Sequence, residues 1–303
     1  MFELTNKEVR IETTNICNAM CIMCPREKHT RKQGIMDMDF FRRLIDEVTD
    51  CGAERIFLGG YGEPLIDPKL AERVQYVKSK GLFCNFISNG SLWNEEITRK
   101  LIDAGLDEIR FSFYGVSDKT YQDVHVNLSF EETNRNIRNL CAVKKGNPQV
   151  LVFYLLLENN EHEVEKFKSE WINIADVIEI WRPHNWSNGR TFRGLDDNKR
   201  SCGRPQTGPL QVQWDGTVIP CCWDYNGEMI LGDLNTQSVP EVFRSKKYDA
   251  IRNAHDEGMF SEFPFCDSCD QLHEHKDAIV YSSRHSKLED AVEMTNSALF
   301  ELR

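Results

Sequence analysis

The stretch VRIETTNICNAMCIMCPR, residues 9–26, joins a strand-like run to three closely spaced cysteines. Residues 9–14 favour a strand, and Cys17, Cys21 and Cys24 follow it in a C-x3-C-x2-C spacing. Three thiolates on one short loop can bind three irons of a cubane iron–sulfur cluster. The missing fourth thiol leaves one iron open to a ligand that is not protein, as catalytic zinc sites keep one position open. We therefore expect a [4Fe–4S] cluster with an open iron site here.

Length and composition set the broad class of the chain. It has 303 residues, which favours one large domain and a smaller one, and a net charge of −11, which argues against general affinity for nucleic acid. The longest apolar run, residues 150–157, is too short to cross a bilayer, and the N-terminus lacks the apolar core of a signal peptide. We therefore expect a cytoplasmic protein with no membrane partner. Its eleven cysteines are not expected to form disulfides, and the grouped ones among them are expected to serve metal binding or catalysis.

Strand-like and helix-like runs alternate from residue 9 to residue 182. The expected strands are residues 9–14, 55–60, 82–90, 108–115, 150–158 and 177–183, and amphipathic helices separate them. Regular alternation implies a parallel sheet with helices outside it. Six units are too few for the closed eight-stranded barrel, so we expect an α/β fold with a partial (β/α)6 barrel. A doubly wound sheet fits the same pattern.

The alternation breaks after Arg182. Residues 183–209 are rich in Gly, Pro, Asn and Arg and predict a loop. Two short strands around Asp215-Gly216 then predict a hairpin, and a helix is expected over about 239–256. We expect a barrel domain over 1–190, a small cysteine-containing domain over 191–275 and a C-terminal helix over 276–303.

The three-cysteine loop resembles the hallmark of radical S-adenosylmethionine (SAM) enzymes, C-x3-C-x-φ-C, with Met23 at the apolar φ position. LGGYGEPLIDP, residues 58–68, is similar to the family's GGE motif, which contacts the SAM amino group; the matching residues are Gly59, Gly60, Gly62 and Glu63. ISNG (87–90) and FSFYG (111–115) resemble the segments that bring Asn89 and Ser112 to SAM. The resemblance implies SAM as cofactor, its reductive cleavage to a 5'-deoxyadenosyl radical, and a flavodoxin or ferredoxin-type reductant.

A second group of cysteines resembles the auxiliary-cluster domain of many radical SAM enzymes, with its C-x9–15-G-x4-C signature. Gly216 stands between the first two of them, and there are too few for the full seven-cysteine SPASM form. The resemblance is to the shorter twitch form, which implies one auxiliary [4Fe–4S] cluster held by Cys202, Cys221, Cys266 and Cys269.

Two questions stay open in this second group. The signature spacing favours Cys221 over Cys222 as a ligand, and neighbouring residues of a strand face opposite ways, so Cys222 is either packed or a hydrogen-atom donor. Zinc bound by Cys266, Cys269 and either His273 or His275 is the alternative to the auxiliary cluster.

The layout of the two clusters resembles that of the 2-deoxy-scyllo-inosamine dehydrogenases, which oxidise a cyclitol alcohol. We therefore expect a radical SAM oxidoreductase that converts an alcohol of a sugar, aminocyclitol or nucleotide sugar to a ketone, with the auxiliary cluster as electron acceptor. The loop after the sixth strand carries polar and aromatic side chains suited to such a substrate. Arg182 and His184 are the candidate catalytic residues, together with Cys222. The same loop residues would otherwise serve only to dock the second domain.

Two other reaction classes fit the same motifs. One is a redox-neutral sugar epimerase or diol dehydratase. The other is a peptide-modifying maturase, although the cluster loop begins at residue 17 and we expect no N-terminal peptide-binding module. A non-enzymatic iron–sulfur carrier would need neither the open iron nor the GGYGEP motif.

Overall fold

The computed structural model describes residues 2–273 and 278–284, and it divides into two compact units. The first unit draws on Met1–Cys17, Lys28–Asn85 and His184–His273. The second draws on Asn18–Glu27, Phe86–Pro183 and Glu274–Arg303. These units cut across the expected boundary near residue 190, so the domain boundaries of the sequence analysis stay a prediction.

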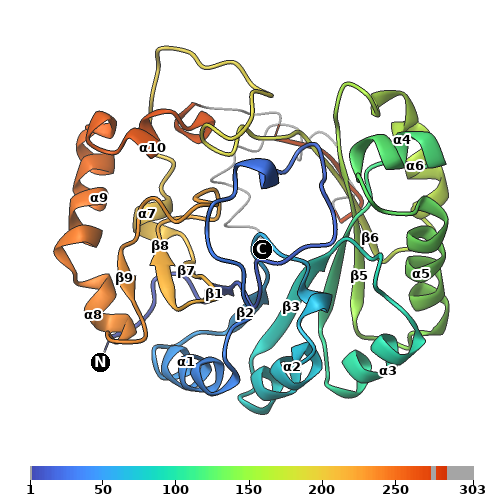
Figure 1. The fold of residues 1–303 in the computed structure, drawn as a ribbon, viewed down its shortest axis with the longest axis horizontal. Coiled ribbons are helices and arrows are strands. Elements are labelled where there is room, and N and C mark those ends of the chain that lie inside the picture. The colour runs from blue at the N-terminus through green and yellow to red at the C-terminus, as the bar shows by residue number, and fades with distance from the viewer. Residues whose placement is uncertain (1, 274–277, 285–303) are drawn as a thin grey trace. The chain divides into compact units, whose positions relative to one another are not determined.

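The first unit contains a mixed sheet in the strand order β3-β2-β1-β7-β8-β9 (Figure 1). Strand β1 pairs in parallel with β2 and β7, whereas β8 runs antiparallel to β7 and β9. The expected hairpin around Asp215-Gly216 is therefore confirmed, and its first strand joins β1. The elements are β1 (Glu8–Ile11), α1 (Met38–Asp50), β2 (Arg55–Leu58), α2 (Leu70–Ser79), the start of β3 (Phe83–Ser88), α7 (Arg204–Thr207), β7 (Leu210–Val212), β8 (Thr217–Ile219), β9 (Gly232–Asp233), α8 (Val239–Phe243), α9 (Lys246–Glu257) and α10 (Pro264–Asp267).

The second unit contains strands in the order β10-β6-β5-β4-β3, and β3 ends in this unit. Strand β5 pairs in parallel with β4 and β6, and β10 runs antiparallel to β6. The elements are α3 (Glu95–Asp103), β4 (Glu108–Ser112), α4 (Asp118–Val124), α5 (Phe130–Val143), β5 (Gln149–Leu155), α6 (Val164–Trp171), β6 (Val177–Trp181) and β10 (Ile279–Ser282). Neither strand set closes on itself, so the expected α/β fold with a partial barrel is confirmed.

Local sequence chemistry explains where the helices begin and which face they bury. Asp37 caps α1 by accepting the backbone N–H groups of Asp39 and Phe40, which satisfies donors that a helix start leaves open. One face of α1 is buried because apolar residues recur at helical spacing; they are Phe40, Phe41, Leu44, Ile45 and Val48. The expected helices of the βα units are confirmed in this way.

Two expectations at the C-terminal end differ from the structure. The helix expected over 239–256 is two helices, because Ser245 leaves the first helix and caps α9 by accepting the N–H of Tyr248. Within 276–303, where a helix was expected, residues 279–282 form β10, whose β-branched and aromatic residues suit a strand on β6. Residues 276–277 and 285–303 of that expected helix lie outside the described residues.

In the described parts of the chain, no helix is both long enough and apolar enough to cross a membrane.

Candidate active site

In the first unit, the loop after β1 runs beside the glycine-rich loop after β2. The N–H of Glu63 donates to the carbonyl of Ile16 over 2.8 Å, immediately before Cys17. A Cβ on Gly62 would lie 2.2 Å from the carbonyl oxygen of Thr14, so only glycine permits this approach. Glu63 is 2% exposed, and its carboxylate accepts the N–H of Leu65. The GGYGE motif is therefore held against the base of the cysteine loop.

Glu12 contacts this glycine-rich loop through a hydrogen bond from Tyr61. Its role was not predicted from the sequence. Its two carboxylate oxygens each accept a hydrogen bond of 2.9 Å from Arg31, and Oε2 also accepts the N–H of Tyr61 over 3.0 Å. A Cβ on Gly60 would lie 2.6 Å from the Glu12 side chain. The available signal was the alternation of Glu8, Arg10 and Glu12, which places three charges on one face of a strand.

In the second unit, the carboxyl ends of β3 and β4 meet the other half of the cysteine loop. Asn89 donates to Asn18 Oδ1 over 3.0 Å, and Tyr114 donates to Ser112 Oγ over 3.0 Å. Burial raises the pKa of Tyr114 to about 12, and the nearby thiols of Cys21 and Cys24 add to the shift. Asn89 thus contacts the cysteine loop directly, and Ser112 binds Tyr114, which packs beside Cys21.

Met23, the residue at the φ position, points into the core rather than to solvent. It is 7% exposed and packs with Val124 and Leu157. Cys21 and Tyr114 are partly buried against the same cluster. Met23 therefore fixes the loop to the second unit between two of its cysteines.

The four cysteines of the second group converge in the first unit. Burial raises the pKa of the Cys266 thiol far above its ordinary value, and the charges of Cys221 and Cys202 add to it. Burial likewise raises the pKa of Cys269, with Asp270 and then Cys202 and Cys266 as further causes. Thiols that raise one another's pKa lie close together, and a bound cationic centre relieves their repulsion. This donor set, Cys202, Cys221, Cys266 and Cys269, therefore fits an iron–sulfur cluster.

Cys222 lies beside two positively charged side chains. The guanidinium groups of Arg10 and Arg204 approach its Sγ at 3.8 and 4.0 Å, which is within reach of a weak hydrogen bond to sulfur. The hydroxyl of Tyr61 donates to the Cys222 carbonyl over 2.5 Å. These contacts hold Cys222 beside the GGYGE loop, whereas burial and the charge of Cys222, with a further contribution from Cys269, raise the pKa of Cys221.

The candidate catalytic residues Arg182 and His184 fall in different units, the second and the first respectively. Arg182 is exposed, and its N–H donates to the carbonyl of Ala278. Both ring nitrogens of His184 face donors of the chain itself: Trp223 Nε1 at 2.7 Å and the N–H of Trp186 at 3.1 Å. A neutral imidazole has one acceptor nitrogen, so only one of these donors is satisfied in a given tautomer.

Burial lowers the pKa of His184 well below its ordinary value, and Arg204 and Arg193 add to the effect. The imidazole of His184 is therefore neutral, and its two nitrogens face donors of Trp223 and Trp186 rather than open space. This geometry favours a positioning role for His184 over a role as general base.

The loop after β6 is strained at Trp186 and Ser187, whose φ angles are 53° and 58°. A bulky residue in this left-handed region costs about 1–2 kcal/mol, and such strain clusters at functional sites. Trp186 lies 4.4 Å from the ring of His184 and 5.3 Å from that of Tyr61, measured between centroids. The loop thus brings an indole beside the GGYGE motif.

Other residues of this loop have structural partners. Asn185 is 4% exposed, and its Oδ1 accepts the N–H groups of Phe192 and Arg193 over 2.7 Å. Of the two histidines in the zinc alternative, His273 Nδ1 lies 2.7 Å from Asp196 Oδ1, and His275 lies outside the described residues.

Comparison with known families agrees with this geometry. The profile of the radical SAM superfamily matches residues 11–170, more than half of the chain, and the chain belongs to this superfamily. The SPASM iron-sulfur cluster-binding domain matches residues 202–270, which span the second cysteine group. The chain is therefore a radical SAM enzyme with a C-terminal SPASM domain. Membership implies a [4Fe–4S] cluster and SAM, and the SPASM domain implies auxiliary iron–sulfur binding rather than zinc.

Relatives at the sequence level include proteins of different activities. The tungsten-containing aldehyde ferredoxin oxidoreductase cofactor-modifying protein of Pyrococcus furiosus is 32% identical over an alignment of 316 positions, which covers 87% of this chain and 89% of the relative. A probable GTP 3',8-cyclase of Methanothermobacter marburgensis is 31% identical over 158 residues, 52% of this chain and 50% of the relative. Similarity to the cyclase thus spans about half of each chain.

Solved structures share the fold at low sequence identity. BtrN in complex with AdoMet and 2-DOIA superimposes with a TM-score of 0.64 at 19% identity, covering 89% of this chain and 94% of BtrN. Streptococcus suis SuiB bound to precursor peptide SuiA superimposes with a TM-score of 0.67 at 12% identity, covering 89% of this chain and 70% of SuiB. At these identities the likeness shows the fold, and the match to BtrN, a radical SAM dehydrogenase of 2-DOIA, supports the expected similarity to the 2-deoxy-scyllo-inosamine dehydrogenases.

Proposed function

We propose that this enzyme removes a hydrogen atom from a polar small molecule and oxidises an alcohol to a ketone, with the auxiliary cluster as electron acceptor. The observation that carries the proposal is a set of four thiols that influence one another's pKa, with Cys269 buried and the others partly buried: Cys202, Cys221, Cys266 and Cys269. Four protein ligands leave no iron for the substrate, which suits electron transfer rather than substrate binding. Cys221 is the proposed fourth ligand, because its charge raises the pKa of Cys266, whereas two guanidinium groups approach the Sγ of Cys222.

The first site would be held by Cys17, Cys21 and Cys24, and the residues around it would bind SAM. When bound, the cluster and SAM supply a radical that accepts a hydrogen atom from the substrate. The protein's part is to orient SAM and the substrate and to exclude water from the site. In this proposal the GGYGE loop would bind the amino group of SAM, and Asn89 and Ser112 are further residues that would bind SAM.

The substrate side of the proposal rests on the loop after β6. The strained Trp186 offers an aromatic face to a ring, and the exposed residue Arg182 carries a guanidinium suited to hydroxyl or phosphate oxygens. His184 holds the Trp186 backbone in place, and Cys222 lies between Arg10 and Arg204 near Tyr61. Arg182 and Cys222 are therefore the candidate residues for contact with the substrate, and His184 is the positioning residue.

A second candidate substrate comes from the near full-length similarity to the Pyrococcus furiosus cofactor-modifying protein. That similarity supports a polar enzyme cofactor, of the kind found in a tungsten-containing aldehyde ferredoxin oxidoreductase, as the molecule acted on. The redox-neutral epimerase or dehydratase and the peptide maturase stay alternatives, and only shared fold supports the last. A flavodoxin or ferredoxin-type protein is the proposed reductant.

Anaerobic turnover of the reconstituted enzyme with substrates deuterated at the reacting carbon tests the proposal. Dehydrogenation predicts deuterium in 5'-deoxyadenosine, a ketone product and one SAM consumed per product. Solvent deuterium in an isomeric product would instead establish an epimerase. Loss of water from the substrate would establish a dehydratase, and either result would overturn the dehydrogenase proposal.

A further inference from the structure

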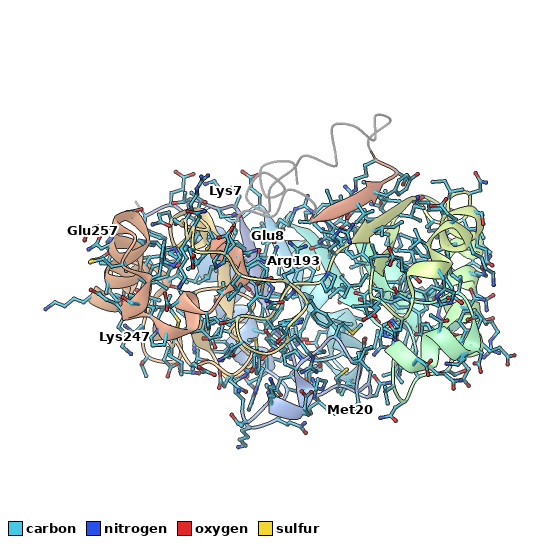
Figure 2. All side chains as sticks on the ribbon, turned by 90° about the horizontal axis from the view of Figure 1, so that it is seen from above. Lys7, Glu8, Met20, Arg193, Lys247 and Glu257 are labelled. Carbon is cyan, nitrogen blue, oxygen red and sulfur yellow. The ribbon has the colours of Figure 1, made fainter. Side chains whose placement is uncertain are left out.

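The segment Val124–Val126 runs alongside the cysteine loop in the second unit. The N–H of Met20 donates to the carbonyl of Val126, and the N–H of Ile22 donates to the carbonyl of Val124, both over 3.0 Å. These two backbone hydrogen bonds flank Cys21 on one side and His125 on the other. The side chain of Met20, labelled in Figure 2, is 44% exposed. The loop is therefore held at this point by the backbone hydrogen bond of Met20 rather than by burial of its side chain. The pairing places Cys21 and His125 opposite each other.

The His125 ring is buried and oriented from three directions. It is 1% exposed, and it lies between the rings of Tyr114 and Tyr121, with centroid distances of 4.8 and 4.6 Å. The backbone N–H of Tyr114 donates to His125 Nε2 over 3.2 Å. His125 Nδ1 lies 3.3 Å from Cys21 Sγ.

These contacts assign the tautomer of His125. Because Nε2 accepts a hydrogen bond from the Tyr114 backbone, it carries no proton, and the single ring proton of the neutral imidazole is on Nδ1. The hydrogen position is thus assigned from the network of heavy atoms. Nδ1 is then the donor, and Cys21 Sγ is the acceptor.

We propose that His125 donates a hydrogen bond from Nδ1 to the sulfur of Cys21 and thereby raises the reduction potential of the first cluster. The inference rests on the proposed assignment of Cys21 as a cluster ligand. A donor beside a ligand sulfur stabilises the reduced state, which carries one more negative charge, more than the oxidised state. Partners of this kind also fix the orientation of the ligand itself. His125 is therefore a positioning residue that acts through Cys21.

Two substitutions of similar size separate the hydrogen bond from simple packing. His125→Asn keeps an N–H donor near the position of Nδ1, whereas His125→Leu has no donor. Tyr121→Phe is the matched control, because it keeps the ring that packs against His125 and leaves the donor unchanged. Each purified, anaerobically reconstituted variant is titrated electrochemically, and the midpoint potential is read from the electron paramagnetic resonance signal that changes when SAM is added.

The hydrogen bond predicts a midpoint potential shifted to more negative values in His125→Leu. It predicts values near the wild type in His125→Asn and Tyr121→Phe. A His125→Leu protein with a full first cluster and an unshifted potential would overturn the inference. Equal shifts in the Asn and Leu variants would assign the effect to packing and overturn it as well.

The wild-type enzyme gives an independent test if the Leu variant does not assemble its cluster. Electron–nuclear double resonance on the reduced first cluster, with 15N-labelled histidine and with D2O exchange, should show coupling to a histidine nitrogen and to one exchangeable proton. Absence of both couplings sinks the inference. A Cys21→Ala protein that still forms the SAM-responsive cluster would instead contradict the proposed function, so the two failures are distinguishable.

Discussion

In the first unit, Glu12 links the glycine-rich loop to Arg31 through hydrogen bonds. One carboxylate accepts two hydrogen bonds from Arg31 and the backbone N–H of Tyr61, and it limits the space beside Gly60. Both charged side chains are at most 9% exposed. Removing one member of such a pair leaves the other charge buried without compensation, which is the costly case for buried ion pairs.

The substitution Glu12→Gln is expected to lower the free energy of unfolding by about 3 kcal/mol, because Arg31 loses its buried partner. Chemical denaturation followed by circular dichroism measures the change. Glu3→Gln, which removes an exposed ion pair with Lys7, is the matched control and should leave the midpoint unchanged. Equal midpoints for the two variants would show that Glu12 does not anchor the loop.

His255 gives the fold a dependence on pH, and its Nδ1 lies 3.1 Å from the hydroxyl of Ser201, the residue before Cys202. Burial lowers the pKa of His255, so the folded state holds the neutral ring while the unfolded chain binds a proton below about 6.5. Stability contributed by this residue is present above that pH and is lost as the pH falls. We expect His255→Gln to show a shallower fall in melting temperature between about pH 7 and pH 5.5 than the wild type does. The exposed His162→Gln variant should keep the wild-type slope, and a wild-type slope in His255→Gln as well would refute the assignment.

Residue types and spacing identified the two cysteine groups but not their supporting partners. A thiol triplet needs no three-dimensional information, because its three ligands lie within eight residues of sequence. His125 is separated from Cys21 by 104 positions, and its role depends on which nitrogen Tyr114 occupies. No spacing in the sequence encodes that contact, so it was not predicted.

At the scale of elements, the alternating hydrophobic pattern predicted each strand of the βα units to within a few residues. Apolar residues recur at different spacings in strands and in helices. The buried face of α1 shows the helical spacing in the sequence. Pairings between distant segments were not predictable in the same way. The parallel pairing of β7 with β1 and the antiparallel pairing of β10 with β6 depend on the tertiary fold, and β10 replaced an expected helix for that reason.

The glycine-rich loop after β2 makes a prediction at this scale. Gly62→Ala would place a methyl group against the Thr14 carbonyl and force the loop away from the residues before Cys17. We expect SAM binding to be lost, measured by equilibrium dialysis with the reconstituted protein. Gly194→Ala, where nothing lies within 4 Å of the new methyl group, is the control and should bind SAM as the wild type does. Normal SAM affinity in Gly62→Ala would remove this loop from the binding site.

At the scale of the whole molecule, the chain carries two thiol sets with different properties. The first set has three members and the second has four, so in the proposed assignment only the first leaves an iron open to SAM. The cysteine count alone suggests this division between the two clusters. The substrate was not predictable, because its recognition depends on side chains such as Arg182 and Trp186 whose spacing matches no fixed pattern.

If the two cysteine sets hold separate clusters, removing one cluster should leave the function of the other. Cys269→Ala is expected to lower iron and sulfide content by about half, since one of two clusters is lost, while SAM still binds and is cleaved. Product formation should stop, because the proposed electron acceptor is missing. Iron and sulfide assays with quantification of 5'-deoxyadenosine and product test this together. Full turnover by Cys269→Ala would exclude the auxiliary cluster from the reaction.

The most direct test of the central claim is electron–nuclear double resonance on the reduced first cluster with SAM labelled by 15N at the amino group and 17O at the carboxylate. If Cys17, Cys21 and Cys24 hold a cluster with one open iron, both labels should couple to it, and the coupling should vanish in Cys21→Ala. A reduced cluster that shows no coupling to either label in the wild-type enzyme would contradict the account.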